Sequence, residues 1–155
     1  MRRKDRQETN PEQISQVINR CDVIRLGLSA PEGAYIVPMN FGWEMENDRP
    51  VFYMHSAREG RKLDLIAASG RAGFEMDCSH RLVTGPEACD YSFRYECVIG
   101  TGAAELLTDP AEKARALAVI VAHQAGRELP VPAEAAAGVA IIRLSADEFS
   151  CKRRL

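Results

Sequence analysis

Six short apolar segments, each rich in β-branched and aromatic residues and bounded by turn-forming sequence, constrain the fold of this chain more than any other feature. The segments are residues 23–29, 35–46, 51–57, 72–79, 91–108 and 139–149. This composition and spacing are typical of strands that follow one another in a meander. An open sheet of six short strands would expose two unpaired edges, and closure into a barrel removes them. We therefore expect an α+β fold that is mainly β, a small six-stranded antiparallel barrel with flanking helices.

Three further segments have the apolar periodicity of helices. They are residues 10–22, 60–70 and 108–128. Pro11 and Pro110 stand where proline is tolerated, in the first turn of the outer two segments. Gly70 is a stop signal for the middle one. We expect these helices at the ends and corners of the barrel.

Local features predict irregular positions within the strands. Pro38 cannot donate to a strand ladder, so its segment is expected at a sheet edge or a bulge. Gly100 and Gly102 indicate a bulge or a close backbone approach. Residues 80–90 are predicted to form a turn-rich connection, and the basic residues 2–4 and 152–154 solvated ends with no site.

The composition limits the class of protein. A chain of 155 residues is the size of one ordinary domain, so we expect a single domain over residues 1–155. A net charge of −2 gives no general attraction to nucleic acid. No apolar run approaches the roughly 20 residues that span a bilayer, and residues 1–13 lack the apolar core of a secretory signal. We expect a cytoplasmic protein that binds neither nucleic acid nor membrane.

The cysteines do not indicate a metal site. The chain has five, and none forms a C-x-x-C motif or pairs with histidine at zinc-finger spacing. We interpret them as reduced thiols, each a small buried hydrophobic residue with no catalytic role, and predict no metal. They are Cys21, Cys78, Cys89, Cys97 and Cys151.

The stretch "HSAREGRKLDLI", residues 55–66, is the strongest candidate for a binding site. It joins a predicted strand to a predicted helix, and it places Arg61 and Lys62 at the helix N-terminus. Cations there are disfavoured by about 0.3–1 kcal/mol each, because the helix dipole is already positive at that end. A bound phosphate would compensate, accepting hydrogen bonds from backbone amides, Ser56 and Arg61, while Gly60 would let the backbone approach it.

A second interpretation of the same stretch needs no ligand. Its cations would form a solvated loop, partnered by Glu59 and Asp64. His55 would then be a hydrogen-bonded structural histidine.

The chain also resembles a known family, the flavin-binding split-barrel superfamily related to pyridoxamine 5′-phosphate oxidase, and within it the nitroimidazole-resistance (Nim) group of small FMN proteins. The segments that carry the resemblance are residues 1–7, 35–44, 51–66, 74–77 and 88–106. They follow the expected order over most of the first 110 residues. The C-terminal helix and strand carry no specific motif.

The resemblance implies a split barrel that forms a homodimer, with two FMN molecules at the subunit interface. The FMN phosphate would lie on His55, Ser56, Arg61 and Lys62, and the flavin ring and ribityl chain along residues 37–40. Histidine at the position of His55 lies near the flavin in Nim-like proteins, which makes His55 the candidate catalytic residue. The complete set of expected cofactor contacts is Val37, Pro38, Met39, Asn40, Met54, His55, Ser56, Gly60, Arg61 and Lys62.

The activity implied is a two-electron transfer from a reduced donor through FMN to a small aromatic or nitro-bearing substrate. The sequence has no G-x-G-x-x-G motif after a strand, so NAD(P)H would dock transiently. One alternative is a non-catalytic flavin- or haem-binding protein, with His55 as an axial or structural ligand. Another is pyridoxamine phosphate oxidation, although that enzyme's basic C-terminal segment is not recognisable in residues 145–155.

Aromatic residues outside these motifs have two interpretations. Tyr91, Phe93 and Tyr95 alternate along a predicted strand and so share one face. They would pack in the core or in a dimer interface, or they would form a wall over the partner subunit's flavin. The same alternatives apply to Trp43.

Overall fold

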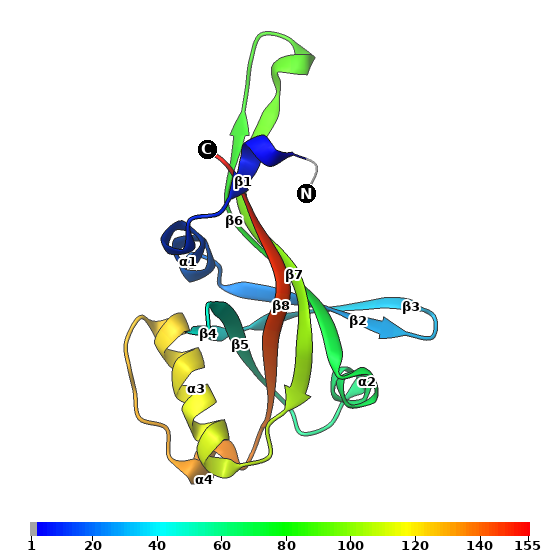
Figure 1. Ribbon diagram of the computed structural model, residues 1–155, viewed down its shortest axis with the longest axis vertical. Helices are drawn as coiled ribbons and strands as arrows, with labels where there is room; N and C mark the ends of the chain where they lie inside the picture. The colour runs from blue at the N-terminus through cyan, green and yellow to red at the C-terminus, as the bar shows by residue number, and fades with distance from the viewer. Residues whose placement is uncertain (1–2) are drawn as a thin grey trace.

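An antiparallel sheet forms the body of the protein in the computed structural model, which describes residues 3–155 (Figure 1). The strands are β1 (Gln7–Glu8), β2 (Val23–Ala30), β3 (Gly33–Asn40), β4 (Gly42–Glu46), β5 (Arg49–Ser56), β6 (Arg71–Val83), β7 (Ser92–Leu106) and β8 (Ala140–Arg154). Their order in the sheet is β3-β2-β6-β7-β8-β5-β4, and β1 pairs with β8. The mainly β class with flanking helices is therefore confirmed.

The sheet curls without closing, which makes it a split barrel. β3 and β4 occupy its two edges, and only Phe41 separates them in the chain. β3 also approaches β5, but no ladder joins these two strands within residues 3–155. The sheet has eight strands where six were expected, because the two-residue β1 adds one and the break at Phe41 divides one expected strand in two.

The three predicted helices are confirmed as α1 (Pro11–Asn19), α2 (Arg61–Ser69) and α3 (Pro110–Ala125). Asn10 caps α1 by accepting from the amides of Glu12 and Gln13, and Asp109 caps α3 by accepting from that of Glu112. Three short helical segments were not predicted: α4 (Ala133–Ala136) and the 3₁₀ turns η1 (Lys4–Arg6) and η2 (Ala88–Asp90). None of the helices in the described part of the chain is long and apolar enough to cross a membrane.

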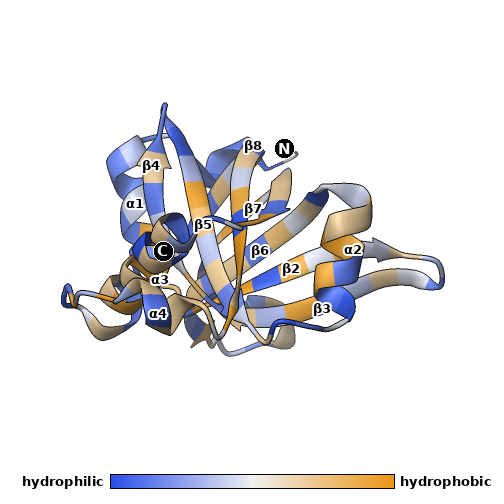
Figure 2. Ribbon diagram, turned by 90° about the horizontal axis from the view of Figure 1, so that it is seen from below, coloured by the Kyte–Doolittle hydropathy of each residue, from blue (hydrophilic) through white to orange (hydrophobic). Residues whose placement is uncertain are grey.

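Aromatic rings fill the centre of the barrel. The ring centroid of Phe52 lies 5.8 Å from that of Phe41 and 5.0 Å from that of Phe74. A smaller cluster lies between α3 and the sheet and includes Tyr53, Ala116 and Ile120. β5 supplies both clusters, because Phe52 and Met54 pack in the main one and Val51 and Tyr53 in the smaller one. Figure 2 shows apolar and polar residues alternating along β2, which buries one face in the main core.

The glycines of β7 lie where the sheet bends. The β7–β8 register shifts between Thr101 and Gly102. A Cβ atom at Gly100 would lie 2.6 Å from Cζ of Phe74, so the backbone comes too close there for any side chain. Pro38 lies in the edge strand β3. The expected bulge and edge position are both confirmed.

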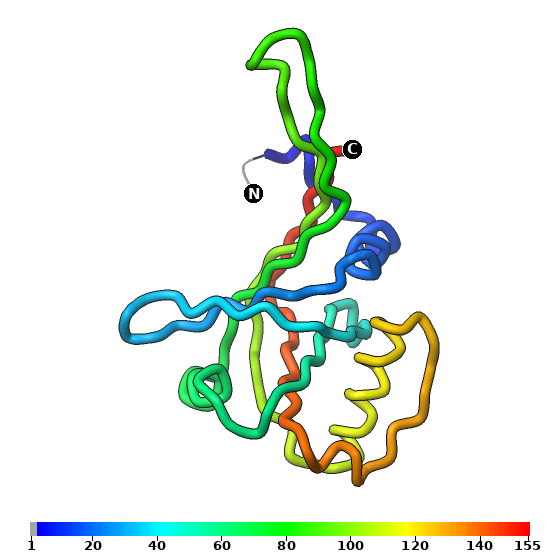
Figure 3. Tube along the Cα trace, turned by 180° about the vertical axis from the view of Figure 1, so that it is seen from behind, coloured from blue at the N-terminus to red at the C-terminus, as the bar shows by residue number. Residues whose placement is uncertain are grey.

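β6 and β7 continue past the body of the protein as a projecting hairpin, which we call the arm, residues 79–94 (Figures 1 and 3). The predicted turn over 80–90 is thus only partly correct, because β6 runs on through Val83. Within the arm, Leu82 pairs with Phe93. Cross-strand pairing with β7 lets a polar sequence that looks turn-prone adopt strand structure.

The basic C-terminus is not a solvated end, and this prediction is wrong. β8 continues to Arg154 and pairs with β7 over its whole final stretch. Nε of Arg153 lies 2.6 Å from Oε1 of Glu96, a side chain only 3% exposed. At the other basic end, residues 2–4, Arg2 lies outside the described residues, and Arg3 and Lys4 are exposed, as predicted.

Candidate functional site

A cavity of about 290 Å³ opens where the ends of β3 and β5 meet the start of α2. It is lined by Val37, Pro38, Met39, Asn40, His55, Ser56, Ala57 and Lys62. These residues come from two stretches of the chain, 37–40 in β3 and 55–62 at the junction of β5 and α2, which the curl of the sheet brings together. All the predicted cofactor contacts except Met54, Gly60 and Arg61 therefore line one cavity.

β3 forms one wall of this cavity as an edge strand. It pairs with β2 alone, so one row of its backbone N–H and C=O groups has no strand partner within the described residues. Pro38 is tolerated there because its missing N–H does not interrupt a central ladder. Such an edge offers backbone donors and acceptors to a ligand that lies along it.

The end of this strand is fixed by a residue that sequence reasoning missed. Nε2 of Gln124 in α3 donates to the carbonyl of Phe41 at 2.9 Å and to that of Asp22 at 3.2 Å. Nδ2 of Asn40 donates to the same Asp22 carbonyl at 3.1 Å. The side chain of Asn40 thus anchors β3, which leaves its backbone for the cavity. No local pattern marks Gln124, because its partners lie far away in sequence.

The N-terminus of α2 faces the cavity as a potential anion site. Gly60 precedes the helix with φ 140°, and no side chain caps the first turn. The amides at a helix start have no intrahelical partner and attract anions. Lys62, half-buried in the first turn, lines the cavity and adds a charge. This arrangement is the donor set that a phosphate group needs.

Arg61 points elsewhere. Its guanidinium forms an ion pair with Glu32, in the turn between β2 and β3, and its Cζ lies 4.9 Å from the centre of the Tyr35 ring. The predicted alternative, in which Glu59 and Asp64 partner the cations of this loop, is wrong for Arg61. The hydrogen bond from Arg61 lowers the pKa of Glu32, so the carboxylate stays ionised. Glu32 was not predicted, because its contact depends on how the β2–β3 hairpin curls toward α2.

His55 is exposed at the end of β5 and lines the cavity. Its ring forms no hydrogen bond to another residue in the part of the chain described, 3–155. The interpretation as a hydrogen-bonded structural histidine is therefore wrong. The hydroxyl of Ser56 donates to the carbonyl of Ala57 at 2.8 Å, and its lone pairs stay available to a donor.

Met54 does not contribute its side chain to the cavity. It is fully buried within the main core cluster. The prediction that the Met54 side chain contacts the cofactor is therefore wrong, because that side chain packs entirely in the core. Gly60 contributes through backbone conformation, at the start of α2.

A comparison with protein families assigns the chain to one of them. The model of the pyridoxamine 5′-phosphate oxidase family matches residues 10–153, nearly the whole chain. The chain belongs to this family. No curated protein sequence matches it.

Solved structures similar to this pyridoxamine 5′-phosphate oxidase family member share its fold. A Bacteroides thetaiotaomicron protein described as a candidate 5-nitroimidazole antibiotic resistance protein is 28% identical, with a TM-score of 0.79 over 94% of this chain and 85% of its own. The flavocytochrome Anf3 of Azotobacter vinelandii is 24% identical, with a TM-score of 0.79 over 100% and 72%. An FAD and heme binding protein of Mycobacterium smegmatis is 18% identical, with a TM-score of 0.78 over 96% and 73%. The last two likenesses concern the fold alone.

The aromatic residues of this family member divide between two environments. Trp43 packs against the core, and its Nε1 donates to Oδ1 of Asn19 at 2.8 Å. Tyr91 and Phe93, by contrast, are 54% and 46% exposed on the arm. Core packing is therefore confirmed for Trp43 and wrong for Tyr91 and Phe93.

The thiols of this family member form no disulfide within the described residues, and Cys21 and Cys151 are buried. Burial raises the pKa of Cys151 to about 12, and it also raises that of Cys21. A thiol that stays protonated is a poor nucleophile. These two cysteines act as small apolar side chains, as predicted. Cys78 and Cys97 are only half-buried, and the prediction of burial is wrong for Cys89, which is exposed at the tip of the arm. The part of the chain described holds no cluster of metal-ligating residues.

Proposed function

We propose that this protein is an FMN-dependent oxidoreductase of the nitroimidazole-resistance type, which reduces small nitroaromatic compounds and works as a homodimer. The observation that carries the proposal is the cavity between β3, β5 and α2. It joins an anion site, an open strand edge and an exposed imidazole.

The residues present fit the parts of FMN. Lys62 and the first amides of α2 would hold the phosphate. The Ser56 hydroxyl, which donates to the Ala57 carbonyl in this structure, would turn its proton to the phosphate instead. The unpaired edge of β3 at residues 37–40 would contact the ribityl chain and flavin ring through backbone groups. Sites for whole ligands of this size occupy about 300–1,000 Å³, and this cavity of about 290 Å³ is at the lower limit. The remainder of the flavin would be covered by the second subunit.

The protein's part in the reaction is to orient and to manage protons. Bound flavin would supply the two-electron chemistry. His55 would hold or deliver a proton at a ring nitrogen, since it faces the cavity without another protein partner among residues 3–155.

The homodimer is supported by an apolar surface that the monomer leaves open. Leu82, Tyr91 and Phe93 on the arm and Ile99 further along β7 are between 41% and 54% exposed. An arm that projects from the body cannot cover these side chains itself (Figure 3). Exposed apolar patches of this kind mark protein interfaces, and we propose that a second copy covers this one. Tyr91 and Phe93 would then lie against the partner's flavin.

A second candidate is a flavin- or haem-binding protein without turnover. The exposed His55 ring favours it, because an imidazole without a protein partner can ligate haem iron. Relatives of the same fold include the flavocytochrome and the FAD and heme binding protein. A Soret band in the purified protein would support this candidate.

Pyridoxamine phosphate oxidation has less support. That activity would need a cation free to hold the substrate phosphate near the C-terminus. Arg153 is instead paired with Glu96 and Glu8. Lys152 and Arg154 have no ion pair among the described residues, but they lie within β8 and are paired through their backbones with β7.

The proposed activity is tested by turnover. Protein loaded with FMN should reduce a 5-nitroimidazole under anaerobic conditions with NADH or NADPH as donor, and His55→Ala should lower kcat while FMN stays bound. Stoichiometric flavin with no reduction of any nitro compound would contradict the reductase proposal. Oxygen consumption with pyridoxamine 5′-phosphate would replace it with the oxidase.

A further inference from the structure

We propose that Glu32 is an internal competitor for Arg61, which sets how strongly the site prefers a phosphate-bearing flavin to the same flavin without phosphate. The inference rests on the proposed function, and it concerns a residue outside the cavity lining.

Arg61 lies next to the potential phosphate site, but its side chain is directed away from that site. It is the first residue of α2, beside the uncapped amides of the helix start, where a phosphate would bind. Its guanidinium instead pairs with Glu32 and lies over the ring of Tyr35. Lys62 lines the cavity and Arg61 does not. In this structure the anion that Arg61 holds is therefore a side chain of the protein.

A phosphate could replace Glu32 as the partner of Arg61. The side chains of Arg61 and Glu32 are 47% and 65% exposed. Exposed ion pairs contribute little, because water and salt screen them. A phosphate carries nearly twice the charge of a carboxylate and offers more acceptor oxygens. It would displace Glu32, and the Tyr35 ring would hold the guanidinium near the start of α2 while the partner changes.

The Arg61–Glu32 pair should affect the binding only of flavins that carry a phosphate. Riboflavin has no group to place on Arg61, so its binding would leave the Arg61–Glu32 pair intact. FMN would have to break the pair. Glu32 therefore lowers the affinity for FMN relative to riboflavin and keeps the cation neutralised when no phosphate is bound.

The experiment compares Glu32→Gln with the wild type at constant ionic strength, by fluorescence titration of the apoprotein with FMN and with riboflavin. We expect the Kd for FMN to fall about two- to fivefold, the range of one exposed ion pair, and the Kd for riboflavin to stay the same. Glu59→Gln is the matched control, since it removes the same charge from the neighbouring loop and has no ion pair in the described chain. A double-mutant cycle with Arg61→Ala should abolish the effect of Glu32→Gln.

Two results would overturn the proposal. If Glu32→Gln weakens FMN binding, Glu32 positions Arg61 and does not compete for it. If Glu59→Gln has the same effect as Glu32→Gln, general charge and not the ion pair is responsible.

A flavin-independent arm separates this inference from the proposed function. Inorganic phosphate should raise the Tm of Glu32→Gln at about two- to fivefold lower concentration than it raises that of the wild type. If FMN fails to bind but phosphate behaves in this way, the cofactor proposal is wrong and the role of Glu32 stands. If phosphate stabilises both proteins equally or neither, the role of Glu32 is refuted.

Discussion

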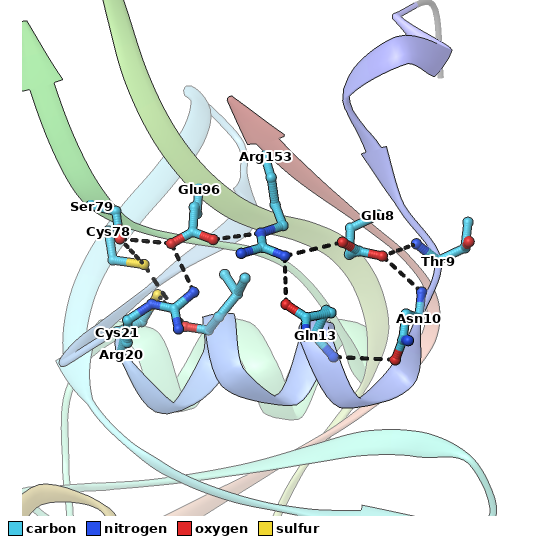
Figure 4. Close-up of polar contacts among 11 residues, drawn as sticks. Glu8, Thr9, Asn10, Gln13, Arg20, Cys21, Cys78, Ser79, Glu96 and Arg153 are labelled. Atoms are coloured by element: carbon cyan, nitrogen blue, oxygen red, sulfur yellow. Dashed lines mark hydrogen bonds and ion pairs between the residues drawn. The ribbon is translucent and has the colours of Figure 1, made fainter. Parts of the chain in front are cut away.

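Glu96 near the start of β7 and Arg153 near the end of β8 are cross-strand partners, with Oε1 of Glu96 2.6 Å from Nε of Arg153 (Figure 4). The other oxygen of Glu96 accepts from Arg20 and from the hydroxyl of Ser79, both at 2.7 Å. Arg153 in turn reaches Gln13 and Glu8. One carboxylate therefore ties α1, the base of the arm and both termini of the described chain together.

Replacing Glu96 by glutamine should destabilise the protein by about 1–3 kcal/mol, because charge-assisted hydrogen bonds to Arg20 and Arg153 are lost. The partly exposed arginines can regain water, which keeps the loss below that of a fully buried pair. Urea unfolding at neutral pH measures it. Glu75→Gln, which removes the exposed pair with Arg25, is the control and should cost less than about 1 kcal/mol. Equal losses in the two variants would refute the role given to Glu96.

The contribution of Glu96 should also depend on pH. Burial alone would raise the pKa of this carboxyl, but hydrogen bonds from Ser79, Arg153 and Arg20 outweigh it and lower the pKa. A carboxyl whose pKa is lower in the folded state stabilises the fold fully above its unfolded pKa, about 4.3. The stability difference between wild type and Glu96→Gln should disappear as the pH falls through the lower, folded pKa. A difference that grows in acid would contradict this sign.

Replacing Tyr53 should lower the stability of the protein about as much as replacing Glu96. Its fully buried side chain donates from the hydroxyl to Glu44 at 2.7 Å and accepts from Nη2 of Arg115 at 2.8 Å. Tyr53→Phe leaves both partners without that oxygen and should lower the free energy of unfolding by about 1–3 kcal/mol. Tyr35→Phe, whose hydroxyl has no protein partner within residues 3–155, should change it by less than about 0.5 kcal/mol. Thermal and urea unfolding of the two variants test this contrast.

The bend of β7 predicts a third stability effect. A Cβ at Gly100 would overlap the carbonyl of Glu148 and crowd the ring of Phe74. Gly100→Ala should therefore cost about 1–3 kcal/mol through overpacking. Gly73→Ala is a matched control on the neighbouring strand, since its nearest atom would lie at an ordinary 3.7 Å. Equal free energies of unfolding for Gly100→Ala and Gly73→Ala would contradict the close approach of β7 at Gly100 to the Glu148 carbonyl.

The sequence predicted what short-range patterns encode. Apolar alternation located the main strands, Pro11, Pro110 and Gly70 marked helix ends, and the cationic turn before α2 pointed to the cavity. Residues that act through distant partners were missed. Glu32 meets Arg61, and Gln124 meets Phe41, only after the sheet has curled.

Predictions failed for the same reason at the end of the chain. The run "KRR" at 152–154 reads as a solvated tail, since its basic residues show no apolar alternation. Arg153 can lie in a strand because its guanidinium forms an ion pair with the buried Glu96, its cross-strand neighbour on β7. Charge complementarity between strands far apart in sequence is invisible to a local pattern.

We propose that the cavity beside α2 binds FMN through Lys62 and the N-terminus of this helix. The most direct test is a visible absorption spectrum of the purified protein, followed by titration of the apoprotein with FMN, for wild type, Lys62→Ala and the control Lys113→Ala on α3. We predict a yellow protein with flavin bands, an unchanged Kd for Lys113→Ala, and a Kd for Lys62→Ala raised roughly 10- to 150-fold by loss of one charged hydrogen bond. Colourless protein that ignores added FMN, or equal FMN affinity in Lys62→Ala and wild type, would contradict the account.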